Sequence, residues 1–165
     1  MTRKLLATIF VICNLAPSSI PSYAAEPPAQ QPGIKLSPDI QNLLRAEMRE
    51  ITTGVQGIAV SLATADWQAI QETSMKIRTS YIMEKKLTPA QAKELEQALP
   101  ERFKQIDEEF HQRAERLGVA AAAHDPELVA FHYSRLVESC ALCHAAFAKS
   151  RFPGFSSPAQ QEHHH

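Results

Sequence analysis

The 165-residue sequence predicts an all-α protein, an antiparallel four-helix bundle. Three observations support this prediction. Hydrophobic residues recur at alternating steps of four and three over long stretches, which is the spacing of a helix face that packs against other helices. Glycine is scarce, with five residues in the chain, and 44% of all residues are hydrophobic, which fits a compact helical protein. No segment has the alternating polar and apolar pattern of a strand.

The first predicted helix opens at Ser37-Pro38, where a capping residue precedes proline at the first helical position. Its apolar seam consists of Leu44, Met48, Ile51, Val55, Ile58 and Leu62. The second helix is predicted to begin near Ala65-Asp66 and to end around Lys86. Its inward face is predicted to hold Trp67, Ile70, Ser74, Ile77 and Tyr81.

The third helix is predicted to begin at a capping box formed by Thr88 and Gln91. Pro100 lies inside its apolar pattern and should kink or break the helix, because proline lacks an N–H and its ring clashes with the preceding turn. The fourth helix is predicted to run from Asp125-Pro126 to about Arg151. Its seam consists of Val129, Tyr133, Leu136, Cys140, Cys143 and Phe147.

The most informative motif is Cys140-Ala141-Leu142-Cys143-His144 on this fourth helix. In a helix, Cys140, Cys143 and His144 stand at i, i+3 and i+4 and share one face. Two thiols at this spacing can add to two vinyl groups of a porphyrin, and the imidazole that follows can bind its iron. The motif therefore predicts one covalently attached haem c. Because both cysteines occupy seam positions, we expect the haem inside the bundle.

Two other kinds of site use a C-x-x-C pair. A dithiol redox pair is expected beside a βαβ pattern, which this sequence lacks. A zinc site needs four ligands, and no second cysteine pair is present. The internal histidines His111, His124 and His132 are scattered rather than placed at zinc-finger spacing. Haem attachment is therefore the favoured interpretation.

The N-terminal segment indicates export. Arg3 and Lys4 precede a short apolar core, and Ser22-Tyr23-Ala24 is a small-x-small cleavage site. A c-type haem is attached outside the cytoplasm, so we expect a periplasmic protein. No later apolar stretch is long enough to span a membrane. The predicted parts of the chain are a signal peptide at 1–24, a flexible leader at 25–36, the bundle at 37–152 and a flexible tail at 153–165.

An exported four-helix chain with C-x-x-C-H on its last helix resembles the class II c-type cytochromes, the cytochrome c-prime family, over residues 37–152. In that family the first helix supplies the residue that faces the open side of the haem. Met48, followed by Ile51, Val55 and Ile58, matches the family's register. The resemblance thus implies Met48 as the second iron ligand, opposite His144. Other residues that could take this place are Met75, Met83 and His111.

The chain also departs from the family pattern. Many members carry Arg or Lys four residues after the haem histidine, where this chain has Ala148. Many carry Arg four residues before the distal position, where this chain has Leu44. The segment Arg151-Phe152-Pro153-Gly154-Phe155 is also unlike the commonest members. These differences indicate a divergent branch.

The predicted function is one-electron transfer by Fe(II)/Fe(III) cycling at a single haem, with a redox partner protein and without enzymatic activity. The alternative is a five-coordinate haem protein that binds small gases such as nitric oxide or carbon monoxide. A haem peroxidase ranks last, since no distal His/Arg pair stands at an interpretable spacing. With 17 basic and 18 acidic residues, the chain gives no reason to expect nucleic-acid binding. The family resemblance also implies a homodimer through the first two helices.

Overall fold

The structure, a computed structural model, describes residues 34–156, and the regular structure in this range is helical. The signal peptide and most of the predicted leader and tail lie outside the described residues. The helices are α1 (Pro38–Ala63), α2 (Trp67–Arg78), α3 (Met83–Lys86), α4 (Pro89–Ala98), α5 (Glu101–Ala122), α6 (Pro126–Phe147) and the short 3-10 helix η1 (Pro153–Phe155). No helix within 34–156 combines the length and apolar character needed to cross a bilayer.

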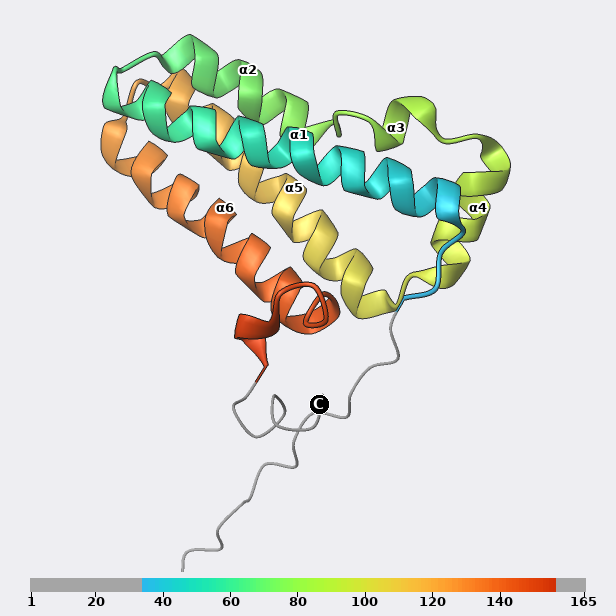
Figure 1. Cartoon of the computed structure of the whole chain (residues 1–165). Helices are drawn as coiled ribbons and strands as arrows, with labels where there is room; N and C mark the ends of the chain where they lie inside the picture. The colour runs from blue at the N-terminus through green and yellow to red at the C-terminus, as the bar shows by residue number, and fades with distance from the viewer. Residues whose placement is uncertain (1–33, 157–165) are drawn as a thin grey trace, which may run out of the picture. The chain divides into compact units, whose positions relative to one another are not determined.

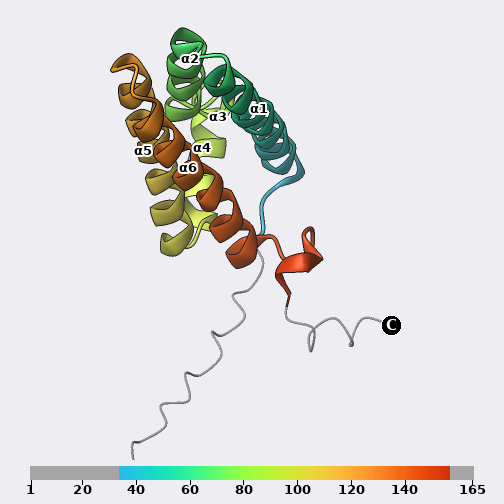
Figure 2. The same ribbon diagram turned by 90° about the vertical axis from the view of Figure 1, so that its left-hand side faces the viewer.

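The four long helices form the bundle (Figure 1). Around it, α1 packs on α2, α2 on α5, α5 on α6, and α6 on α1. Figure 2 shows the same four helices from the side, with α3 and α4 in the connection between α2 and α5. The predicted all-α four-helix architecture is therefore confirmed.

Short-range signals set most of the helix starts. The side chain of Thr88 accepts a hydrogen bond from the Gln91 N–H at 3.3 Å, and the Thr88 N–H donates to the Gln91 side chain at 3.0 Å, so the predicted capping box is present. The Asp125 carboxylate caps α6 by accepting hydrogen bonds from the Glu127 N–H at 3.0 Å and the Leu128 N–H at 2.9 Å. Pro100 breaks the predicted third helix, because α4 ends at Ala98 and α5 begins at Glu101.

Two predicted helix ends were wrong. The second helix ends at Arg78 rather than near Lys86, and α3 forms a separate turn after it. Ser80 adopts a left-handed backbone conformation, with φ of 57°, which a continuous helix does not allow. The last helix ends at Phe147 rather than near Arg151, and Pro153–Phe155 forms η1 at the start of the predicted flexible tail.

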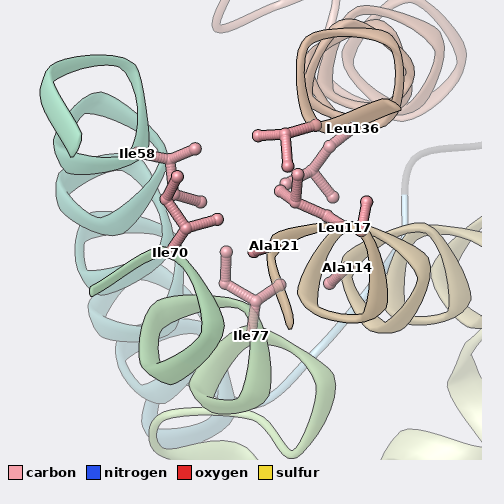
Figure 3. Close-up of a cluster of buried hydrophobic side chains, with 9 residues drawn as sticks. Ile58, Ile70, Ile77, Ala114, Leu117, Ala121 and Leu136 are labelled. Carbon is pink, nitrogen blue, oxygen red and sulfur yellow. The ribbon is translucent and has the colours of Figure 1, made fainter. Parts of the chain in front are cut away.

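The hydrophobic core lies between all four long helices (Figure 3). It consists of Ile58, Ile70, Ile77, Ala114, Leu117, Ala120, Ala121, Val129 and Leu136. On α5 the core residues lie in the second half of the helix, and on α6 they precede the cysteine motif. The core therefore fills the part of the bundle around the α5–α6 connection, and the cysteines lie beyond its last member on α6.

Candidate functional site

The cysteine motif occupies the last two turns of α6. Cys140, Cys143 and His144 are all half-buried, and neither cysteine is in a disulfide. The helix places the three side chains on adjacent positions of one face, as their spacing requires. The site thus offers two free thiols and one imidazole.

The His144 flank of α6 points away from α5. On the flank next to α5, Phe131, His132 and Arg135 line a cavity of about 190 Å³ together with Glu109, Arg113 and Arg116 of α5. At 3.6 residues per turn, His144 lies about 120° around the helix from His132. The other helix that packs on α6 is α1. The imidazole of His144 is therefore on the side of α6 that faces α1.

Burial favours the protonated form of both thiols. It raises the pKa of Cys143 to about 11, with smaller contributions from the charges of Asp107 and Cys140. Burial also raises the pKa of Cys140. Thiol–disulfide exchange requires a thiolate, and reactive cysteines have a lowered pKa. The environment of this pair therefore does not suit a dithiol redox site.

Met48 lies on the flank of α1 that faces away from α2. The opposite flank is marked by Gly54, where an added Cβ would lie 2.4 Å from Tyr81 Oη and 3.0 Å from Thr73 Cγ2 of α2. Met48 is about 120° around the helix from Gly54. Since α6 is the other long helix packed on α1, Met48 lies on the flank toward α6.

The thioether of Met48 belongs to a sparsely covered apolar stripe. Met48 is 40% exposed, and Leu44 and Val55 on the same flank are half-buried. Figure 1 shows α1 and α6 close together near the start of α6 and diverging toward its cysteine end. Apolar surface left partly exposed between two helices favours an additional apolar group. The two thiols, the imidazole and the thioether form a donor set that fits a haem c. The apolar stripe on α1 fits the apolar faces of its macrocycle.

The other predicted ligand positions are less suitable. His111 is held by Nδ1 at 2.7 Å from the Ile77 carbonyl oxygen, which ties α5 to the end of α2. Met75 is 60% exposed on α2, and Met83 belongs to the short helix α3. Within residues 34–156, no group of three or more His, Cys, Asp or Glu side chains could hold a metal ion. Met48 remains the candidate opposite His144.

A buried carboxylate beside Met48 was missed by the sequence analysis. Glu47 is 2% exposed and accepts hydrogen bonds from the Ser80 hydroxyl at 3.1 Å and from three backbone N–H groups. These N–H donors are Tyr81 at 2.8 Å, Ile82 at 2.5 Å and Met83 at 3.1 Å. The carboxylate satisfies donors that the end of α2 and the start of α3 leave free. The spacing along the helix could have predicted this burial. Glu47 stands seven residues after Ile40 and four before Ile51, so it shares a helix face with these two buried side chains.

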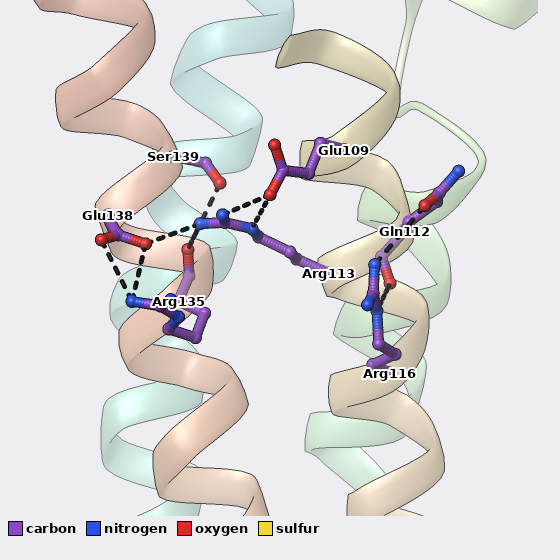
Figure 4. Close-up of polar contacts among 7 residues, drawn as sticks. All are labelled: Glu109, Gln112, Arg113, Arg116, Arg135, Glu138 and Ser139. Carbon is purple, nitrogen blue, oxygen red and sulfur yellow. Dashed lines mark hydrogen bonds and ion pairs between the residues drawn. The ribbon is translucent and has the colours of Figure 1, made fainter. Parts of the chain in front are cut away.

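A polar network braces α5 against α6 just before the cysteine motif (Figure 4). The mostly buried guanidinium of Arg113 forms ion pairs with Glu109 and with Glu138 at 3.0 Å. It also donates to the Arg135 carbonyl oxygen at 2.5 Å. Arg135 in turn pairs with Glu138 at 3.1 Å. One arginine thereby fixes the α5 flank of α6, one turn before Cys140.

Comparison with protein families agrees with this arrangement. The family model described as cytochrome c′ matches residues 38–148, from the first residue of α1 to the residue after α6. Comparisons with curated proteins and with solved structures found no match. The family match covers all four long helices and the whole C-x-x-C-H motif, and it includes well over half of the chain. The chain therefore belongs to the cytochrome c′ family of haem c-type cytochromes.

Proposed function

We propose that this protein carries single electrons through one haem c, attached at Cys140 and Cys143 and ligated by His144 and Met48. The proposal is supported by helix register: Met48 lies away from the α2 flank of α1 and His144 lies away from the α5 flank of α6, and α1 and α6 are packed on each other. A thioether on one helix and an imidazole on the other can then bind one metal from opposite sides. The haem supplies the Fe(II)/Fe(III) couple.

The protein groups suit this role. Burial, followed by the charge of Arg151, lowers the pKa of His144, which favours the neutral imidazole that binds iron. A thioether opposite histidine stabilises reduced iron and raises the reduction potential. Leu44, Ile51 and Val55 stand three or four residues or two turns from Met48 along α1 and make its flank of the helix apolar. Electron transfer of this kind needs no acid, base or nucleophile from the protein, so we propose no enzymatic activity.

The cellular setting follows from the attachment chemistry. We expect residues 1–24 to direct export and the mature protein to be periplasmic, where a redox partner protein exchanges electrons with it. Val60 on α1 and Met75 on α2 are large apolar side chains with most of their surface exposed. They agree with the expected homodimer through these two helices.

Gas binding is the second candidate function. The Met48 side chain is 40% exposed, so neighbouring side chains cover only part of its thioether. Without a thioether on the iron, the site would hold five-coordinate haem with an open side for nitric oxide or carbon monoxide. Electron transfer and gas binding therefore differ in whether the Met48 sulfur is bonded to the iron.

Substitution of Met48 tests that bond. In the oxidised wild-type protein we expect a low-spin spectrum with a weak near-infrared band from thioether ligation. Met48→Ala should remove the band, convert the haem to high spin and open the site to carbon monoxide. Met75→Ala is the matched control, because it removes an exposed thioether on α2 and should change nothing. A high-spin wild type, unchanged by Met48→Ala, would favour gas binding instead.

A further inference from the structure

The chain that follows α6 folds back toward His144. The Ala148 N–H donates to the His144 carbonyl oxygen at 2.9 Å, which completes the last turn of the helix. The N–H groups of Arg151 and Phe152 then both donate to the Ala148 carbonyl oxygen, at 3.0 and 2.9 Å. This turn reverses the chain and returns Phe152 to the end of α6.

Phe152 stacks on the imidazole of His144. The ring centroids are 4.2 Å apart and the planes differ by 19°, the closest ring contact among the described residues. The guanidinium carbon of Arg151 lies 5.9 Å from the centroid of the Phe152 ring. Within residues 34–156, the His144 ring forms no hydrogen bond. The aromatic stack is the one ring contact of the His144 imidazole in the described part of the chain.

The residue at position i+4 leaves space for the stack. On a helix the side chain four residues after His144 would lie beside its imidazole, and this position is Ala148. A methyl group there does not reach over the ring. Phe152, brought back by the turn, stacks on the imidazole instead and is itself half-buried.

We propose that Phe152 is a positioning residue for the iron ligand, holding the plane of the His144 imidazole and shielding it from water. The proposal rests on the proposed function, in which His144 binds the iron. In most metal sites the ligating histidine donates its other ring N–H to a second group, and this hydrogen bond fixes the orientation of the ring. In this protein an aromatic face does so, because a stacked ring restricts rotation of the imidazole about its Cβ–Cγ bond.

The test uses the haem-loaded protein and three variants. Phe152→Leu keeps an apolar side chain but removes the aromatic stack. Phe152→Tyr keeps an aromatic ring and therefore the stack. Phe155→Leu is the matched control, because it removes an exposed phenylalanine three residues further along that has no ring contact with His144. Electron paramagnetic resonance of the oxidised form reports the orientation of the axial imidazole. Nuclear magnetic resonance of the reduced form reports contacts between the two rings.

We expect wild-type protein and Phe152→Tyr to give cross-peaks between ring protons of residue 152 and His144. In Phe152→Leu, the cross-peaks to His144 and the contribution of the residue 152 ring to the shifts of the His144 protons should be lost. The electron paramagnetic resonance lines of the iron should broaden. Phe155→Leu should match the wild type. Absence of ring cross-peaks in the wild type would overturn the proposal, even if Phe152→Leu failed to fold. So would an unchanged iron spectrum in a folded Phe152→Leu.

The two proposals fail in different ways. Protein that shows no haem-sized mass increment after denaturation overturns the proposed function and this inference together. Protein that carries haem, and whose spectrum changes in His144→Ala but not in Phe152→Leu, overturns the inference alone.

Discussion

The α2–α5 side of the bundle and the α1–α6 side are built differently. Between α2 and α5 small residues allow close packing, and a Cβ added at Gly118 would lie 3.2 Å from the Ser74 Cβ. Ile77 and Leu117 are fully buried there. Between α1 and α6, near the cysteines, Met48 is substantially exposed and the thiols are half-buried.

This difference shows how a bundle can carry a cofactor. Close-packed helices leave no room for another group, because protein interiors are packed as densely as organic crystals. The α2–α5 side supplies stability, with α5 further braced on α6 by Arg113. The α1–α6 side leaves apolar surface uncovered near the cysteines, and the haem of the proposed function would cover it. Four mutational experiments test this contrast, from the largest expected effect to the smallest.

Removal of both attachment thiols should have the largest effect. The double variant Cys140→Ala/Cys143→Ala should lose covalent haem completely, measured as absence of the haem mass increment. Amide hydrogen exchange should then increase in the first half of α1 and the last turns of α6, while α2 and the second half of α5 stay protected. Leu142→Ala, between the two cysteines, should keep the haem. Equal loss of protection on both sides would contradict the contrast.

Truncation of Leu117 tests the closely packed side. Leu117→Ala should lower the free energy of unfolding by about 2–5 kcal/mol, since it removes buried methyl groups and leaves a cavity. Val119→Ala is the control, because that side chain is 67% exposed and its loss should cost less than about 0.5 kcal/mol. Chemical denaturation of the two variants measures the difference. Equal costs would mean that the core does not lie where the structure places it.

Truncation of Glu47 tests how α1 is tied to the α2–α3 connection. Glu47→Ala should cost about 1–3 kcal/mol, because several buried donors lose their acceptor at once. The amides of Tyr81, Ile82 and Met83 should exchange faster with solvent. Glu50→Ala removes an exposed carboxylate from the same helix and should leave both measurements near wild type. Unchanged exchange in Glu47→Ala would show that these hydrogen bonds do not hold the connection.

Two glycines on α1 give the smallest and most selective comparison. Gly54→Ala should destabilise the protein by about 1 kcal/mol, because the new methyl group meets Tyr81 and overpacking outweighs the gain in helix propensity. Gly57→Ala meets nothing within 4 Å and should stabilise the protein by about 0.5–1 kcal/mol. Thermal unfolding of the two variants should therefore shift in opposite directions. A shift in the same direction would contradict the close approach of α1 to α2.

Features that depend on neighbouring residues could be predicted from the sequence. The capping box at Thr88 and the break at Pro100 are local, and both are present. The seams predicted the four-helix architecture, and the spacing of Cys140, Cys143 and His144 placed them on one helix face. Each of these depends on hydrogen bonds or side-chain spacing within about one or two turns of helix.

Features that depend on distant residues were decided by the tertiary structure. The early end of α2 is followed by donors, Ser80 and Tyr81, whose acceptor is Glu47, more than thirty residues before them. The seam of α1 placed Met48 inward, whereas packing gives the buried position to Glu47 and leaves Met48 on the flank toward α6. The contact of Phe152 with His144 required a chain reversal that no periodicity encodes. Spacing along a helix fixes which residues share a face, but only the neighbouring helices fix what that face contacts.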